Sequence, residues 1–337
     1  MIDFRYHIVS LVAVFLALSV GVILGAGPLQ NSIGNALTGQ VSSLSESNQA
    51  LKAENTELKT QIQGQDKAWD VAAPALITDA LKDTNIAIVA FPGASADDVD
   101  TVTSAVQDAG GTVASSVSIT PEWTASSQTA FRTTFAEQIS AYLPEGSEAS
   151  DTNTILSTAL VQLLTGNLEE ENTATLQDLM ASADTAMIEF AQEPSAPAQL
   201  VLFVAGDLSA PEAQADAQAN SDEAAQRDYD MKTYTNLVKF VSGKVPTEVA
   251  GYANSPEDLL TAIRSGGIDA STVDSIDTAV GRINVALAAS SELANDKVDL
   301  GFEAGATLPL GQRAIVTPAA EEAPDGADNT ESAPAQE

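Results

Sequence analysis

The side chains that most often perform catalysis or bind soft metals are scarce in this sequence. It has no cysteine and a single histidine, His7. Thiolate chemistry, disulfides and Ser-His-Asp catalysis in the body of the chain are therefore excluded. Soft metals prefer Cys, His and Met, and Met180 and Met187 stand one helical heptad apart, a spacing more typical of a core. We expect no enzyme and no cofactor, and no set of metal ligands can be named.

Carboxylates are the one abundant reactive group. The chain has 47 acidic and 14 basic residues, which give a formal net charge of −33. Such a field repels nucleic acid, which is bound through clustered Lys and Arg, so no nucleic-acid partner is expected. An enzyme that uses a carboxylate pair stays open as a weaker alternative, because so many acids offer too many pairs to single one out.

The turn after the clearest predicted strand does not suit a nucleotide. Residues 86–91 are a short apolar run, and the Pro-Gly turn behind them lacks both the GxGxxG and the Walker patterns. Ser95 can cap the helix that follows. Asp97 and Asp98 in its first turn would place negative charge where a phosphate binds. A nucleotide cofactor is therefore not expected.

The elements that must position these groups begin with an apolar segment. Residues 8–26 carry no charge over 19 positions, and as a helix they span about 28 Å, close to the hydrocarbon core of a bilayer. We expect a retained single-pass transmembrane helix in contact with membrane lipid; the alternative is a cleaved signal peptide. Arg5 precedes the segment, and the next basic residue is Lys52. Residues 1–7 are therefore expected in the cytoplasm and the bulk of the chain outside the cell membrane.

Two features predict self-association. Gly21 and Gly25 form a GxxxG pair, which lets two membrane helices approach closely. After a Gly-, Asn- and Ser-rich linker at 27–40, residues 41–66 carry heptads typical of a short coiled coil. The coiled-coil seam at its a and d positions consists of Val41, Leu44, Asn48, Leu51, Asn55, Leu58 and Ile62. Because Asn at position a favours a parallel dimer, we expect a parallel homodimer or a higher homo-oligomer. The alternative is a single amphipathic helix that lies on the globular domain.

A doubly wound α/β domain is expected over residues 74–300. The predicted strands are 86–91, 113–119, 200–205 and 247–252, and helices are predicted at 97–109, within 122–183, and at 229–241, 256–264 and 280–293. Asp277 can cap the last of these helices. Because β-α-β connections make parallel sheets, the fold class is α/β, a Rossmann-like parallel-sheet domain behind the transmembrane helix and coiled coil. Residues 207–228 are interpreted as a mobile loop or exposed helix, and the acidic, Pro- and Ala-rich residues 318–337 as a disordered tail.

Two stretches resemble a known family. Residues 5–25, RYHIVSLVAVFLALSVGVILG, closely resemble the start of the actinobacterial MctB family, which is named for mycobacterial copper transport. Residues 271–282, STVDSIDTAVGR, are similar to that family's motif near its C-terminal end. The motif residues are Ser271, Asp274, Asp277, Gly281 and Arg282. We interpret the motif as a structural turn and cap rather than a site. The likeness covers most of residues 1–305.

The resemblance implies a cell-envelope protein of the copper transporter type, with pore activity in the outer membrane and with copper as the transported species. It brings no catalytic residues. One apolar helix cannot enclose a pore, so a channel would need an oligomer or partners. We therefore expect a dimeric, single-pass envelope protein that supports copper efflux and copper homeostasis. The alternative is a non-transporting scaffold that binds partners through the α/β domain and the acidic tail.

Overall fold

The computed structural model describes residues 4–26, 28–144, 151–181, 185–206 and 221–314. The chain divides into two compact units, Met1–Gln65 and Asp66–Glu337. Most of the predicted loop at 207–228 and the whole predicted tail at 318–337 lie outside the described residues.

The first unit is built from α1 (Phe4–Ala26) and the larger part of α2 (Pro28–Ile77). In the described part of the chain, one helix is long and apolar enough to cross a membrane, Phe4–Ile23, and none of that window is buried inside the protein. An unburied helix of this composition suits a lipid environment.

The prediction of a linker at 27–40 is wrong for residues 28–40, because α2 is already helical from Pro28. Proline is well tolerated at the first position of a helix, where its missing N–H has no partner to lose. Beyond it, Leu37 lies one heptad before Leu44, and Leu29 and Ile33 precede it at four-residue steps, a spacing typical of one helix face although it leaves the a and d positions. Glycine and asparagine lower helix propensity by about 1 kcal/mol or less each, so they do not interrupt this pattern.

The apolar seam of α2 is uncovered within one chain. Val41, Leu44, Leu51, Leu58 and Ile62 are each at least half exposed. The coiled coil needs a second helix on this face, so the homodimer stays a prediction.

The second unit contains a seven-stranded sheet in the order β3-β2-β1-β4-β5-β6-β7. Its strands are β1 (Asn85–Ala90), β2 (Thr112–Ile119), β3 (Ile188–Gln192), β4 (Leu200–Val204), β5 (Thr247–Ala250), β6 (Ser271–Val273) and β7 (Asp299–Leu300). Neighbouring strands run parallel except β2 and β3, which are antiparallel. The chain winds outward from β1 in one direction and then from β4 in the other, which is the doubly wound arrangement. The predicted α/β fold class is confirmed.

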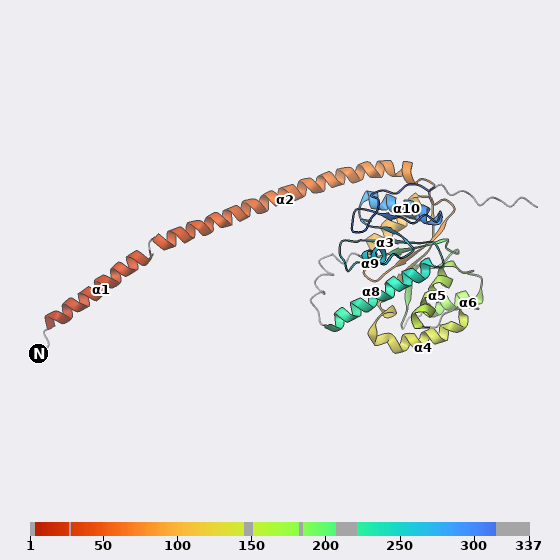
Figure 1. Ribbon diagram of the computed structural model, residues 1–337, viewed down its shortest axis with the longest axis horizontal. Coiled ribbons are helices and arrows are strands. Elements are labelled where there is room, and N and C mark those ends of the chain that lie inside the picture. The colour runs from red at the N-terminus through yellow and green to blue at the C-terminus, as the bar shows by residue number, and fades with distance from the viewer. Residues whose placement is uncertain (1–3, 27, 145–150, 182–184, 207–220, 315–337) are drawn as a thin grey trace, which may run out of the picture. The chain divides into compact units, whose positions relative to one another are not determined.

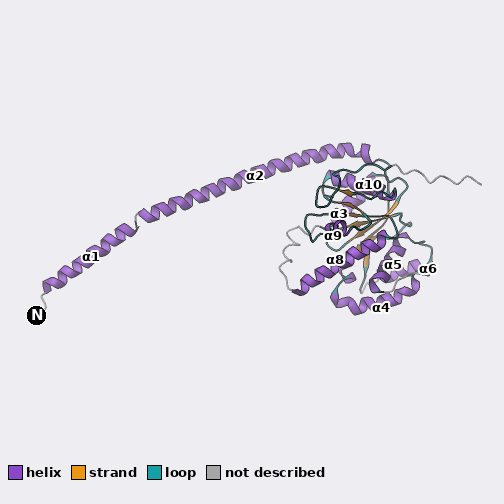
Figure 2. Ribbon diagram, viewed as in Figure 1, coloured by secondary structure: helices purple, strands orange, loops and turns teal. Residues whose placement is uncertain are grey.

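Helices cover both faces of the sheet, as Figures 1 and 2 show. The helices of this unit are α3 (Ala96–Asp108), α4 (Thr129–Ile139), α5 (Thr152–Thr165), α6 (Glu171–Met180), α8 (Ser221–Ser242), α9 (Leu259–Gly266) and α10 (Ala279–Leu293). Ile86 and Ile88 of β1 pack in one core with α3, α10 and the end of α2, whereas Ala87 and Val89 pack in another with α4, α5, α6, α8 and α9. Because both faces are covered, the central strands are apolar throughout instead of alternating.

The elements that the sequence did not predict are short or poor in apolar residues. Strands β3, β6 and β7 have five, three and two residues, too few to show a period. Helix α8 begins eight residues before the predicted start at Tyr229. The prediction began too late because Ser221 to Asp228 lack an apolar stripe. The cap of α3 agrees with expectation, because Ser95 and Asp98 form a reciprocal capping box.

Candidate functional site

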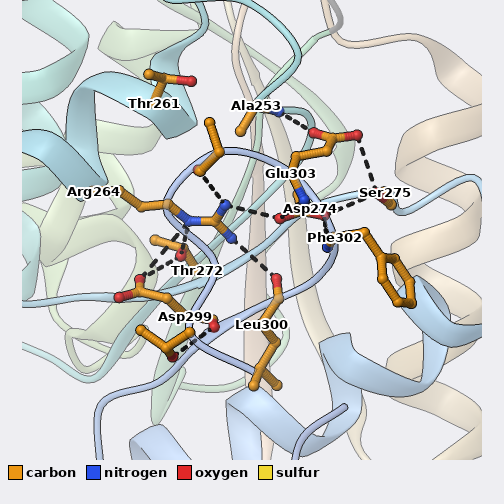
Figure 3. Close-up of polar contacts among 12 residues, drawn as sticks. Ala253, Thr261, Arg264, Thr272, Asp274, Ser275, Asp299, Leu300, Phe302 and Glu303 are labelled. Carbon is orange, nitrogen blue, oxygen red and sulfur yellow. Dashed lines mark hydrogen bonds and ion pairs between the residues drawn. The ribbon is translucent and has the colours of Figure 1, made fainter. Parts of the chain in front are cut away.

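The motif residue Asp274 lies at the centre of a buried polar cluster where β6 ends (Figure 3). Arg264 of α9 donates through Nη1 to Asp274 Oδ2 at 2.8 Å, and the two side chains are 4% and 0% exposed. The same guanidinium donates from Nε to the Thr272 hydroxyl at 2.8 Å and from Nη2 to the Leu300 carbonyl at 3.0 Å. The arginine therefore joins α9 to β6 and β7.

The segment after β7 is bound to the same carboxylate. The backbone N–H of Phe302 donates to Asp274 Oδ1 at 2.8 Å. Gly301 has φ +134°, and a Cβ there would overlap the Asp274 carboxylate, so this close approach requires glycine. We name Arg264, Asp274, Ser275 and Glu303 the Asp274 clamp.

Glu303 completes the Asp274 clamp from the opposite side. Its carboxylate accepts hydrogen bonds from the Ser275 hydroxyl at 3.0 Å and from the backbone N–H of Ala253. Burial raises the pKa of Glu303, and the charges of Asp274 and Asp258 add to this effect. The clamp thus attaches the C-terminal segment to the loops that follow β5 and β6.

The motif residue Ser271 belongs to a second buried cluster, at the other end of β6. Its hydroxyl and its backbone N–H donate to Glu292 Oε2 of α10 at 2.7 and 3.1 Å. Lys297 pairs with the same carboxylate. Glu248 of β5 is fully buried nearby, and neither of its carboxylate oxygens has a hydrogen-bond partner among the described residues. Burial, and then the charge of Glu292, raise the pKa of Glu248 well above its usual range.

The remaining motif residues lie at the start of α10. The expectation that Asp277 caps this helix is wrong: the cap is Thr278, whose hydroxyl accepts from the backbone N–H of Gly281 at 3.0 Å. Ser275 has a left-handed backbone with φ 54°, and its carbonyl accepts from the backbone N–H of Thr278 at 3.0 Å, so this turn ends at the cap residue. A Cβ at Gly281 would overlap the Ser275 carbonyl oxygen. Arg282 pairs with Asp70 of α2 at 2.8 Å on a half-exposed surface.

A cavity of about 450 Å³ opens where the strand order reverses, at the carboxyl ends of β1 and β4. In doubly wound folds this crevice is the usual ligand site. We name it the switch-point cavity. Phe91 and Gly206, which follow β1 and β4, form part of its wall, together with Met231 and Tyr234 of α8 and Leu259 of α9. The Phe91 ring stacks on Phe203 at 5.1 Å and meets Tyr234 at 4.9 Å.

Charged groups at this cavity come from α8 and from the segment before α9. They are Arg227, Asp228, Asp230 and Glu257. Asp230 accepts a 2.6 Å hydrogen bond from Gln226. The Tyr234 hydroxyl shares a 3.1 Å hydrogen bond with the Thr124 hydroxyl, and burial raises the pKa of this tyrosine to about 12. Its ring is therefore a neutral, apolar wall at physiological pH.

Soft metal ligands do not gather in the described part of the chain. No group of three or more His, Asp or Glu side chains that could hold a metal ion occurs there. Met180 and Met187 are fully buried in the core. Met231 lines the switch-point cavity. One thioether alone is a weak ligand set for copper.

The family relationship rests on nearly the whole sequence. A family model described as "Copper transport outer membrane protein, MctB" matches residues 1–310. The chain belongs to the MctB family. It is 33% identical over 151 residues to the copper transporter MctB of Mycobacterium tuberculosis (strain H37Rv), and 30% identical over 164 residues to that of Mycobacterium leprae (strain TN). Each match covers 44% of this chain and 47% of the relative, so the chain spans less than half the length of the curated relatives it matches.

Within this MctB-family domain, sequence reasoning missed Arg264, Glu303 and the cavity face of α8. The sequence pattern marks Arg264 only as the end of a helix, although it is one of 14 basic residues and precedes Asp274 by ten positions. On α8, positions 224, 227, 228 and 231 share one helical face. That spacing was a usable signal, but the helix was expected to start only at 229.

Proposed function

We propose that this protein supports copper efflux, and so copper homeostasis, as a membrane-anchored and self-associating component of the cell envelope. The observation that carries the proposal is the family match over residues 1–310, whose description names copper transport and the outer membrane. The matched mycobacterial relatives are named copper transporters.

Anchoring by α1 supports the proposed location. The helix provides one candidate span, and Arg5 in its first turn favours a cytoplasmic N-terminus with the α/β domain outside. Either the cell membrane or, as the family description has it, the outer membrane would hold this anchor.

The proposed route for copper requires self-association. A single helix cannot enclose a pore, whereas several copies, or this chain with partners, can. The uncovered apolar seam of α2 offers a face for a second copy, and Gly21 and Gly25 suit close helix packing in the membrane.

The ligand chemistry favours copper as a transported species rather than a resident one. The chain lacks cysteine, and its one histidine precedes the apolar segment. Among the described residues, no cluster of metal ligands occurs. We therefore propose that copper passes through an assembly to which this chain contributes structure.

The cellular copper content of a strain that lacks this protein tests the proposal. If the protein supports copper efflux, the cellular copper content should rise in the deletion strain and return to normal when the full chain is restored. Unchanged copper, together with an altered envelope, would instead favour the non-transporting scaffold. Equilibrium dialysis of the full chain in detergent micelles against Cu(I) tests whether the chain itself binds copper. One tightly held copper per chain would overturn the proposal that the chain contributes only structure to the assembly.

A further inference from the structure

The switch-point cavity has the position of a ligand site but an unusual charge. In doubly wound folds the crevice between the two strands at the reversal binds ligands, and phosphates lie at the N-terminus of the helix after the first strand. Here that helix is α3, and its own residues occupy its N-terminus: the Asp98 carboxylate accepts from the Ser95 N–H and hydroxyl at 3.2 and 2.7 Å. Tyr252 donates to the second Asp98 oxygen at 2.8 Å.

The polar lining of the cavity has an excess of negative charge. Its charged groups are three carboxylates, Asp228, Asp230 and Glu257, and one guanidinium, Arg227. With Asp97 exposed in the adjacent first turn of α3, this crevice repels anions and attracts cations.

The remaining walls are aromatic or apolar. Phe91, Tyr234, Met231 and Leu259 line the cavity. Aromatic faces attract cations through the ring quadrupole, and thioethers adapt to irregular apolar shapes. The volume of about 450 Å³ falls within the range typical of small-molecule sites, roughly 300–1,000 Å³.

We propose that the switch-point cavity binds an organic cation, namely a small molecule with an apolar or aromatic body and an ammonium group. The body contacts Phe91, Tyr234 and Met231, and the ammonium group faces Asp228 and Glu257 at the rim. This inference goes beyond the proposed function and does not depend on it, because no copper takes part in the binding.

Calorimetric titration of the full chain in phosphatidylcholine nanodiscs tests this site, with benzyltrimethylammonium as the probe and empty nanodiscs as the blank. Benzyl alcohol and phenylacetate keep the ring and replace the positive charge. We expect saturable one-site binding of the cation, binding at least about tenfold weaker for the alcohol, and none for the carboxylate. Equal binding of the alcohol, or tighter binding of the anion, would overturn the proposal.

Two variants locate the binding. The double variant D228N/E257Q removes two exposed carboxylates of the rim and is expected to weaken cation binding about tenfold or more. Its matched control, D100N/D108N, changes the net charge equally on the exposed face of α3 across the sheet and is expected to leave binding unchanged. Ala224 of α8 also lines the cavity, and the variant A224W, which fills the cavity without changing the charge, should abolish binding. If the control weakened binding as much as D228N/E257Q, the probe would be responding to net charge and the site would be wrong.

Discussion

Arg264 and Asp274 form a 2.8 Å ion pair that is almost wholly withdrawn from water. The pair joins α9 to the carboxyl end of β6, and the Asp274 carboxylate also accepts from the backbone of Phe302. Asp274 of the 271–282 motif therefore organises the edge of the sheet and the chain that follows β7.

Removing the Asp274 charge should destabilise the domain strongly. The variant D274N removes the 2.8 Å partner of the buried Arg264 guanidinium and leaves it only the half-exposed Asp299 at 3.9 Å. Breaking a buried ion pair typically costs about 3–5 kcal/mol of unfolding free energy. Urea unfolding of the full chain in micelles measures this. The matched control is D70N, which breaks an Arg–Asp contact of the same 2.8 Å length whose side chains are 35% and 56% exposed. Its cost should stay below about 1 kcal/mol, and equal costs for the two variants would contradict a burial effect.

Gly281 should resist substitution although it lies in a helix. Helix propensity alone predicts that G281A gains about 1 kcal/mol. The new Cβ would overlap the Ser275 carbonyl oxygen, so we expect a net loss of about 1–3 kcal/mol from overpacking. Thermal unfolding decides the sign. The control G266A, at the end of α9, meets only an ordinary contact with Ile268 and should be neutral or stabilising. A stabilised G281A would show that the turn can move.

Glu248 should make the domain less stable as pH rises. Its folded pKa lies well above the usual 4.5, so the folded chain holds this proton more tightly than the unfolded chain. The contribution to stability is therefore fully present below about pH 4.5 and is lost as pH rises through the folded pKa.

Unfolding free energies at several pH values test this assignment. The advantage of E248Q over the native chain should grow from about pH 4.5 upward, because the variant has no proton to lose. At pH 8, E248M should be more stable than the native chain by about 1–3 kcal/mol, since it removes a buried polar group that has no partner among the described residues. The control E189Q removes an exposed carboxyl of β3, and a trend of the same size in this variant would contradict a burial effect. A pH-independent difference between E248Q and the native chain would contradict the raised pKa.

The uncovered seam of α2 should pair with a second copy. The chain has no cysteine, so a single introduced thiol reports on one position. Under mild oxidation, L51C at a d position should form a disulfide-linked dimer, because d positions of parallel helices face each other. The control A53C, at an outward f position, should not. Non-reducing electrophoresis separates the cases, and equal yields would argue against the predicted register.

The strong periodic signals of the sequence located most of the fold. The apolar runs of β1 and β4 and the capped, amphipathic α3 were identifiable because burial on both faces and capping leave marks within a few residues. Strands β6 and β7 left no such mark. Strand β6 has only three residues and β7 only two. They are held in the sheet by the neighbouring strands and, for β7, by Arg264, which is remote from it in sequence.

The candidate site was less accessible to sequence reasoning for a similar reason. Asp274 could be named from its motif, but its role depends on Arg264, ten positions earlier, and on the backbone of Phe302, 28 positions later. Likewise, the switch-point cavity combines residues after β1 and β4 with α8 and α9. Only the strand order brings these segments together.

The claim that the membrane-anchored protein supports copper efflux is tested most directly by the cellular copper content of a deletion strain that carries residues 27–337 behind a cleavable export signal. This chain would reach the same side of the membrane without the anchor. If copper homeostasis needs the membrane-anchored assembly, copper in this strain should remain as high as in the deletion, whereas the full chain should restore it to normal. Restoration of normal copper by the exported chain without its anchor would contradict the claim.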